Sequence, residues 1–310
     1  MRDRIEFAKG ALLGLACGDA LGAPIEFRRR DSFPLHTEMT GGGAFGVLAG
    51  EWTDDTAMAL CLAESLVECR GFDSSDQLAR YLSWLDEGYM ACQAVCIDIG
   101  RTTMNALRRF EYTEASYAGT DNPFESGNGG IMRLAPSVLS ATHRNMALEQ
   151  AINSSRTTHA SADCLDAAEL LGAILWELGQ GNDLRVVLEK LPETDERSTA
   201  IGRIQQGFFR SLNRDEVSSS GYVIDTLEAA LWACYRAGSF EEAIVTAVNL
   251  GEDADTVGAV TGQIAGAAWG VSAIPERWLS RLAWREKIEV LAAEVCKLAE
   301  LDAVECRSVV

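Results

Sequence analysis

Residues 258–270, GAVTGQIAGAAWG, place a glycine at every fourth position. A second glycine series with the same spacing occupies positions 10, 14, 18 and 22. Each glycine costs a helix about 1 kcal/mol relative to alanine, so eight of them at helical spacing need a compensating contact. Residues four positions apart share one face of a helix, where glycines let a second backbone come close. The two series therefore predict two buried, tightly packed helices.

Apolar residues at helical spacing continue through much of the remaining sequence. Three such stripes are Leu171, Ile174, Leu175 and Leu178; Val223, Leu227, Leu231 and Tyr235; and Ile288, Leu291, Val295 and Leu298. The pairs Ser74 with Gln77 and Ser239 with Glu242 match the capping box that begins helices. Strand-like alternation is scarce, so these patterns predict an all-α fold, a compact orthogonal bundle of roughly a dozen helices.

No linker rich in proline, serine or glycine divides the chain, so we expect a single domain over residues 1–310. Segments 28–51, 111–130 and 212–221 are expected to be loops over that domain. The chain has 27 basic and 46 acidic residues, a formal charge of −19. Such a surface repels phosphate backbones and anionic lipid, which excludes nucleic acid and membrane surfaces as expected partners.

The expected location is the cytoplasm. The sequence has no signal-peptide pattern and no run of about twenty apolar residues that could span a membrane. Its nine cysteines are odd in number and include no CxxC pair. Scattered cysteines of this kind are typical of reduced thiols in a reducing compartment.

Two acidic clusters precede predicted helices: WTDDT at 52–56 and EDADT at 252–256. Aspartate and threonine are common helix caps, so either cluster alone could simply begin a helix. Together they resemble each other, and neither has a local cation: no lysine or arginine occurs from residue 31 to 69 or from 237 to 276. Unpaired buried carboxylates cost several kcal/mol each, so their charge must be compensated from elsewhere.

Two sources of compensation are open. The distant Arg28, Arg29 and Arg30 could pair with the aspartates, although three adjacent arginines are more typical of a solvated loop. Divalent metal ions could bind instead. A set of carboxylate and hydroxyl oxygens suits Mg²⁺ or Mn²⁺ rather than zinc, and an acid that bridges two ions would complete a binuclear site.

Four stretches in a fixed order carry a resemblance to a known family. They are GLACGDALGAPIE at 14–26, WTDDT at 52–56, SGNGGIMR at 126–133, and DADTVGA at 253–259 with the glycine series that follows it. In this order the sequence resembles the ADP-ribosylglycohydrolases, the group of dinitrogenase-reductase-activating glycohydrolase and the ADP-ribosylarginine hydrolases. The resemblance implies an all-α fold around two divalent cations, Mg²⁺ or Mn²⁺. It also implies hydrolysis of the N-glycosidic bond between ADP-ribose and a modified protein side chain, most consistent with arginine.

The same resemblance assigns site residues by position. The implied metal ligands are Thr53, Asp54, Asp55, Asp253, Asp255 and Thr256. The implied catalytic residues are Glu26, which would activate water or the leaving group, Asp98, which would act at the substrate ribose, and the ligand Asp55. The implied substrate-binding residues are Ser126, Gly127, Asn128, Gly129 and His159.

Each assignment has an ordinary structural alternative. Glu26 could be a surface acid after a proline, and Asp98 could cap the helix that follows it. His159 could cap or support a helix start. Residues 126–130 could be a plain turn, whereas their functional interpretation is a nest of backbone N–H groups at a helix N-terminus that binds diphosphate or ribose. Asp19 is expected to be structural.

Two other functions compete with hydrolysis of an ADP-ribosylated protein. The chain could be an immunity protein that docks on an ADP-ribosylating toxin, a role that an acidic surface would suit and that does not exclude hydrolysis. It could also be a metal phosphohydrolase acting on nucleotides, which the order of the four stretches disfavours. The expected partners are therefore a mono-ADP-ribosylated protein and, in the alternative, a toxin.

Overall fold

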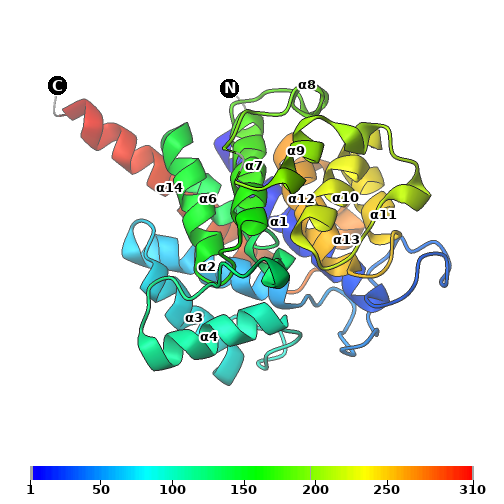
Figure 1. Ribbon diagram of the computed structural model, residues 1–310, viewed down its shortest axis with the longest axis horizontal. Coiled ribbons are helices and arrows are strands. Elements are labelled where there is room, and N and C mark those ends of the chain that lie inside the picture. Colours follow the sequence, from blue (N-terminus) through cyan, green and yellow to red (C-terminus); the bar gives the residue numbers. More distant parts are fainter. Residues whose placement is uncertain (1–2, 196, 309–310) are drawn as a thin grey trace.

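The computed structural model describes residues 3–195 and 197–308 (Figure 1). These residues form fourteen α-helices and no strand beyond three isolated bridges, which confirms the all-α prediction. The helices are α1 Arg4–Gly22, α2 Asp54–Cys69, α3 Ser74–Glu87, α4 Arg101–Thr113, α5 Ala135–Leu139, α6 Arg144–Arg156, α7 Ala162–Gly179, α8 Leu184–Glu189, α9 Thr199–Gln205, α10 Val223–Arg236, α11 Phe240–Val248, α12 Ala254–Trp269, α13 Glu276–Leu279 and α14 Arg285–Ser308.

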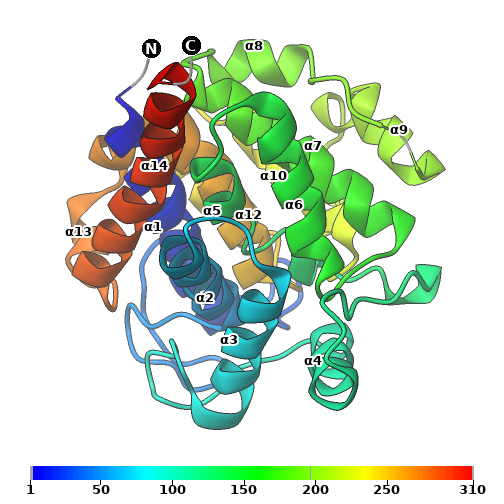
Figure 2. The same ribbon diagram turned by 90° about the vertical axis from the view of Figure 1, so that its left-hand side faces the viewer.

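The two glycine series lie on helices α1 and α12, which come from opposite ends of the chain and lie side by side in the middle of the molecule (Figures 1 and 2). A Cβ atom added at Gly14 would overlap the carbonyl oxygen of Gly262, and one added at Gly262 would overlap the carbonyl oxygen of Gly14. Gly18 and Gly258 face each other in the same way. The predicted close packing is confirmed, because only glycine fits along this helix pair.

The remaining helices surround this pair. Helices α2, α11 and α14 pack against α1 or α12, α10 and α7 pack against α12, and the α3–α4 unit lies below α2 in Figure 2. The three predicted apolar stripes fall on α7, α10 and α14, as expected. None of the described helices is long and apolar enough to cross a bilayer.

One of the two capping predictions is confirmed and the other needs correction. Ser239 caps α11, because its side chain accepts a hydrogen bond from the backbone N–H of Glu242 at 3.2 Å. Helix α3 does begin at Ser74, but Asp73 is its cap and accepts from the N–H groups of Ser75 and Asp76, both at 2.9 Å. The carboxylate one residue earlier reaches two free N–H groups at once, which a serine hydroxyl at position 74 does not.

Candidate functional site

A cleft of about 500 Å³ opens where the starts of α2, α4 and α12 meet the segments around residues 127 and 159. Most of the residues predicted for the site line it. They are Glu26, Asp54, Asp98, Asp253 and Thr256 together with Gly127, Asn128, Gly129 and His159. Thr53, Asp55 and Asp255 are buried behind this surface. We call Glu26, Asp54, Asp55, Asp98, Asp253 and Asp255 the acidic cluster, and Gly127, Gly129 and His159 the histidine wall.

Asp19 fixes the start of α2 against α1. Its Oδ1 accepts hydrogen bonds from the backbone N–H and the hydroxyl of Thr53, both at 2.9 Å. Its Oδ2 accepts from the backbone N–H of Thr56 at 3.0 Å and from its hydroxyl at 2.6 Å. Four donors thus satisfy a completely buried carboxylate, which supports the structural role expected for Asp19.

Asp55 and Asp255 face each other from the starts of α2 and α12. The hydroxyl of Thr53 lies 3.3 Å from Asp55 Oδ2 and 3.4 Å from Asp255 Oδ2. The other oxygen of Asp55, Oδ1, is buried and has no hydrogen-bond partner. A buried acceptor without a partner carries a desolvation cost, so Asp55 is placed to bind a group that the protein alone does not supply.

Carboxylate oxygens gather into two groups in which all atoms lie within 4.8 Å of one another. One group is Asp19, Asp55 and Asp255, and the other is Glu26, Asp98 and Asp255. Asp255 belongs to both. Glu26, like Asp55, has a buried oxygen, Oε2, with no partner. A shared carboxylate between two oxygen-rich groups is the arrangement by which an acid bridges two hard cations.

The acidic cluster carries charge that no arginine compensates. No ion pair within the described residues reaches any of its carboxylates. Arg30, one of the arginines considered for this role, donates instead to the backbone carbonyls of Leu250 at 3.1 Å and Val217 at 2.5 Å. Arg30 therefore does not compensate the charge of the aspartates, and its guanidinium instead ties two loops together.

Burial and mutual repulsion raise the pKa values of these acids. Burial is the largest cause for Glu26, followed by the charges of Asp255 and Asp98, and its pKa rises to about 12. Burial and the charge of Asp253 raise the pKa of Asp98 to about 6. Burial first, and then the charges of neighbouring carboxylates, hold the pKa values of three further aspartates well above the ordinary value: Asp54, Asp55 and Asp255. Positive charge placed among these acids would relieve the repulsion.

Asp253 connects the acidic cluster to the segment around residue 127. Asn128 Nδ2 donates to Asp253 Oδ2 at 2.6 Å and to the hydroxyl of Thr226 at 2.9 Å. Asp253 occupies the N-cap position of α12 and Thr53 that of α2, yet neither side chain makes a capping hydrogen bond. Helix capping therefore does not explain these two residues. Their side chains contact other residues of the site instead: Asp253 contacts Asn128, and Thr53 lies beside Asp55 and Asp255.

Asp98 is not a helix cap either. The cap position of α4 is Gly100, and Asp98 lies two residues earlier with a left-handed backbone, φ 54°. Left-handed φ is uncommon for residues other than glycine, asparagine and aspartate, and strained residues of this kind often occur at functional sites. The side chain lines the cleft beside Glu26, so the structural alternative for Asp98 is wrong.

Residues 126–130 differ from the expected helix N-terminus. They form a bend followed by a short 3₁₀ turn, Asn128–Gly130. The N–H of Asn128 is already bonded to the carbonyl of Gly221 at 3.2 Å, which ties this segment to the neighbouring loop. Ser126 lines an adjoining hollow rather than the cleft, and its hydroxyl bonds to Pro123 and to Ser161. The segment is therefore a turn and not the start of an α-helix, and loop pairing occupies the N–H of Asn128. That its other N–H groups bind diphosphate or ribose stays a prediction.

His159 lies on the cleft, where its ring packs against the glycines of the histidine wall. A Cβ atom added at Gly129 would lie 2.6 Å from Cε1 of His159, so the ring requires glycine there. The cap of α7 is Ser161. The capping alternative for His159 is therefore wrong.

Several residues that line the cleft were not predicted as site residues: Phe27, Arg101, Thr103, Met132 and Glu252. Each lies close in sequence to a predicted one. Phe27 follows Glu26, Arg101 begins α4 three residues after Asp98, and Met132 and Glu252 lie within the motifs at 126–133 and 252–256. The N–H of Phe27 donates to the carbonyl of Glu252 at 2.7 Å, a contact between distant segments that the sequence does not indicate.

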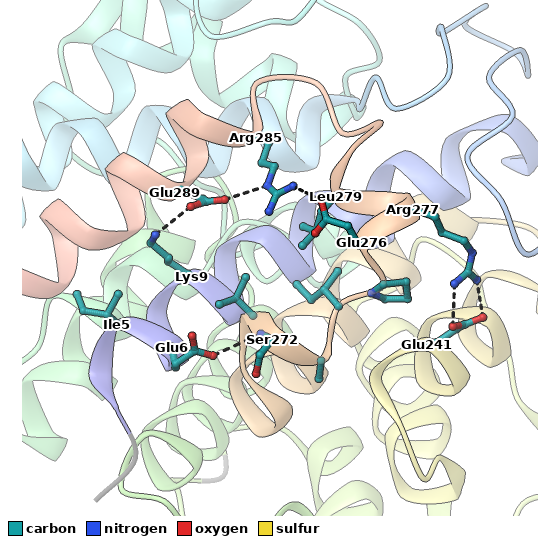
Figure 3. A pocket seen from close by; sticks show the side chains of 14 residues that line it. Ile5, Glu6, Lys9, Glu241, Ser272, Glu276, Arg277, Leu279, Arg285 and Glu289 are labelled. Atoms are coloured by element: carbon teal, nitrogen blue, oxygen red, sulfur yellow. Dashed lines mark hydrogen bonds and ion pairs between the residues drawn. The ribbon is translucent and has the colours of Figure 1, made fainter.

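A second hollow, of about 770 Å³, lies between the start of α1, the α13 segment and the start of α14 (Figure 3). Most of its charged side chains pair with one another. Lys9 and Arg285 both bond to Glu289, at 2.9 and 3.0 Å, and Arg277 bonds to Glu241 (Figure 3). Glu6 instead accepts a hydrogen bond from the backbone N–H of Ser272. Because partners within the chain engage these charges, this hollow offers no chemistry comparable to that of the acidic cluster.

Comparison with known proteins agrees with this geometry. The family model described as ADP-ribosylglycohydrolase matches residues 1–305. A solved structure titled "ADP-ribosylglycohydrolase-related protein complex" superimposes with a TM-score of 0.85 at 43% identity, over 96% of this chain and 100% of that chain. The chain belongs to the ADP-ribosylglycohydrolase family, and the predicted hydrolase class is confirmed.

Two relatives of the chain carry names that state an activity. The chain is 40% identical over 305 residues to ADP-ribosylarginine hydrolase Tri1 of Pseudomonas putida, which covers 97% of this chain and 81% of that protein. It is 33% identical over 292 residues to ADP-ribosyl-[dinitrogen reductase] glycohydrolase of Rhodospirillum rubrum, over 91% of this chain and 92% of the relative. Both names describe hydrolases that act on ADP-ribosylated groups.

Proposed function

We propose that this chain hydrolyses the N-glycosidic bond between ADP-ribose and a protein arginine, and that it requires two divalent cations, Mg²⁺ or Mn²⁺. The observation that carries the proposal is Asp255, which is buried behind the cleft surface and belongs to two groups of carboxylates. Relatives named ADP-ribosylarginine hydrolase, including a second one from Serratia proteamaculans at 40% identity, support arginine as the linkage.

The residues of the acidic cluster fit divalent cations. All the atoms that they offer as ligands are oxygens, and two of these oxygens are buried without hydrogen-bond partners. No local arginine neutralises their charge. Asp55 and Asp255, which belong to the two groups of carboxylates, would hold the ions. Asp54, Asp253 and the hydroxyls of Thr53 and Thr256, the other ligands that the family resemblance implies, would complete the set. Divalent ions bound there would neutralise the acidic cluster and lower the pKa of water toward neutrality.

The chain's own residues account for the other needs of the reaction. Water adds to C1″ of the ribose as the bond to the guanidino nitrogen breaks, and the proton of that water ends on the released guanidine. Positive charge builds on the sugar as the bond breaks, and the carboxylate of Asp98 beside the cleft stabilises it. Glu26, which lines the same cleft, would move the proton between water and the leaving nitrogen.

The test is incubation of the protein with substrates ADP-ribosylated on arginine or on serine, with Mg²⁺, Mn²⁺ or chelator, followed by measurement of free ADP-ribose. Release from the arginine substrate that depends on added metal is the expected result. Release only from serine, or release undiminished by chelator, would contradict the linkage or the metal requirement respectively.

A second role, neutralising an ADP-ribosylating toxin by docking on it, is favoured only by the acidic surface with its formal charge of −19. The two roles separate in a variant that lacks Asp255. If docking protects, Asp255→Ala protects a toxin's target without releasing ADP-ribose. If hydrolysis alone protects, the variant gives no protection.

A further inference from the structure

A completely buried arginine lies behind the histidine wall. Arg133 follows the 3₁₀ turn that carries Gly129, and none of its side chain is exposed. Its guanidinium lies 4.7 Å from the centre of the Tyr81 ring and donates to the carbonyl of Gly129. Within the described residues no carboxylate forms an ion pair with it. A buried cation without an anion is costly, so its position calls for a reason.

The guanidinium reaches His159 through one hydroxyl. Arg133 Nη2 donates to Thr158 Oγ1 at 2.6 Å, and the same oxygen lies 2.8 Å from His159 Nδ1. Both Thr158 and Arg133 are fully buried. The backbone on either side is fixed as well, because the N–H of His159 donates to the carbonyl of Ser155 at 2.7 Å and the hydroxyl of Ser155 donates back to the carbonyl of His159 at 3.0 Å.

The chemistry of these groups decides which way each hydrogen points. Arginine is only a donor, so the Thr158 hydroxyl accepts from Arg133. That hydroxyl has one hydrogen, and His159 Nδ1 is the remaining atom within reach. If Nδ1 carried a hydrogen instead, the hydroxyl hydrogen would be buried with no acceptor, which costs about 1–3 kcal/mol. Nδ1 therefore accepts, and the ring hydrogen is on Nε2.

Nε2 is the end of the ring that faces the cleft. It is directed toward Gly127 and Gly129, and both glycines and His159 line the cleft wall. Burial, with the positive charge of Arg133 as a second cause, lowers the pKa of His159 to about 3, so the ring stays neutral at physiological pH. The histidine wall thus presents one N–H group of fixed direction and constant protonation.

We propose that Arg133, acting through Thr158, is a positioning residue that fixes His159 as an Nε2–H hydrogen-bond donor to an oxygen of bound ADP-ribose. The choice of ligand rests on the function proposed above, whereas the fixed tautomer rests only on the contacts of Arg133, Thr158 and His159. Because the free protein already holds the tautomer that binds, no binding free energy is lost in selecting it. The neutral Nε2–H donor also suits ADP-ribose, whose polar atoms are mostly oxygen acceptors.

The tautomer can be measured without ligand by ¹⁵N NMR of protein labelled in its three histidines, His36, His143 and His159. His159→Gln identifies the signal of His159. We expect the Nε2–H form, unchanged between about pH 5 and pH 8 because the histidine pKa lies far below that range. A wild-type His159 that carries its hydrogen on Nδ1, or that becomes charged in this range, would overturn the proposal.

Two substitutions of Thr158, the residue between Arg133 and His159, give a matched pair. Thr158→Val removes the hydroxyl, so we expect a mixture of tautomers and a Kd for free ADP-ribose about tenfold weaker. Thr158→Ser keeps the hydroxyl and should keep both the Nε2–H form and the affinity. A Thr158→Val protein with unchanged ¹⁵N shifts and unchanged Kd would overturn the proposal.

Arg133→Met tests the first link. Without the guanidinium, the carbonyl of Ser154 loses the hydrogen bond from Arg133 and becomes an acceptor for the hydroxyl hydrogen of Thr158, four residues later. The hydroxyl oxygen can then accept from Nδ1–H, and the tautomers should mix as they do in Thr158→Val. Thermal melting shows whether this variant folds, and if it does not, the Thr158 pair decides the matter alone. Failure of the proposed function has a different signature: wild-type protein with the Nε2–H form that does not bind free ADP-ribose.

Discussion

The two walls of the cleft differ in how their polar atoms are partnered. In the acidic cluster, Glu26 and Asp55 each keep a buried oxygen without a partner, and burial first, then repulsion by neighbouring carboxylates, raises the pKa values of both. On the histidine wall, Thr158 joins Arg133 to Nδ1 of His159, and Nε2 of His159 faces the cleft. The buried atom without a partner on this side is a donor, Arg133 Nε, rather than a carboxylate oxygen. The acidic cluster would therefore need ions that the chain does not supply, whereas contacts within the chain already hold the His159 ring.

The largest expected effect comes from removing the carboxylate that both halves of the acidic cluster share. Asp255→Ala should lower the rate of ADP-ribose release at least about a thousandfold, because bound ions supply several kcal/mol of charge stabilisation. Its melting temperature without metal should not fall, since one repelling charge is gone. Asp55→Ala should behave likewise. Near-normal release from either variant would remove these residues from the catalytic site.

The control is a buried aspartate whose carboxylate is fully partnered within the chain. Asp166 is fully buried, but Arg197 donates to it at 2.9 Å and so do two backbone N–H groups. Asp166→Asn should lower the melting temperature while leaving the rate of release unchanged, because the carboxylate is paired and lies outside the cleft. Opposite responses of Asp166 and Asp255 would sharpen the distinction between satisfied and unsatisfied acids.

Asp98→Asn tests the acidic cluster with a smaller change, which removes a charge but keeps the size of the side chain. Asparagine tolerates the left-handed backbone of position 98, so we expect an unchanged melting temperature and unchanged metal content. Asparagine cannot accept a proton or carry charge beside the ribose, and such help is worth about 10²- to 10⁴-fold. We therefore expect ADP-ribose release to fall at least about a hundredfold, measured against Asp31→Asn, another left-handed aspartate that lies outside the cleft. Full activity of Asp98→Asn would leave that carboxylate without a role in the chemistry.

The sequence was most informative where a pattern repeats along one element. The glycine series predicted close backbone approach between buried helices, and the structure shows that α1 and α12 approach each other there. The two acidic motifs predicted that the starts of α2 and α12 would form one site, since each motif is local and its residues keep their spacing. The family resemblance supplied Glu26, Asp98 and His159, and the structure places all three on the cleft.

Features that depend on contacts between distant segments could not be predicted in this way. Asn128 and Asp253 are 125 residues apart, and nothing local indicates that an amide of one satisfies the carboxylate of the other. For residues 126–130 the sequence left a plain turn and a helix start both open, because Gly221, the partner that holds the turn, is likewise remote. Arg133 is the last residue of the motif at 126–133, but its contact with Thr158 forms only in the folded chain.

Metal and protons should compete for the acidic cluster, so its contribution to stability depends on pH. The folded-state pKa of Asp98, about 6, lies above its ordinary value of 3.8. For a raised pKa the contribution is fully present below the ordinary value and is lost as pH rises through the folded value. Metal-free protein should therefore lose stability from about pH 4 to pH 6, and its melting temperature should fall further below that of metal-loaded protein toward about pH 8. A gap that stays constant from about pH 5 to pH 8 would contradict this competition.

The smallest expected effect belongs to Ser126, which the sequence placed among the substrate-binding residues. Its hydroxyl donates within the protein, lying 2.9 Å from the carbonyl of Pro123 and 2.7 Å from the hydroxyl of Ser161, and it does not line the cleft. Ser126→Ala should therefore cost about 1 kcal/mol of stability through the lost hydrogen bonds. The KM for an ADP-ribosylated substrate should change less than about twofold, because a contact that the ligand never makes contributes nothing to binding. Gly129→Ala is the contrasting change, since its Cβ would press on the His159 ring and should weaken binding of ADP-ribose. A KM raised about tenfold or more by Ser126→Ala would return that hydroxyl to the substrate and extend the histidine wall into the adjoining hollow.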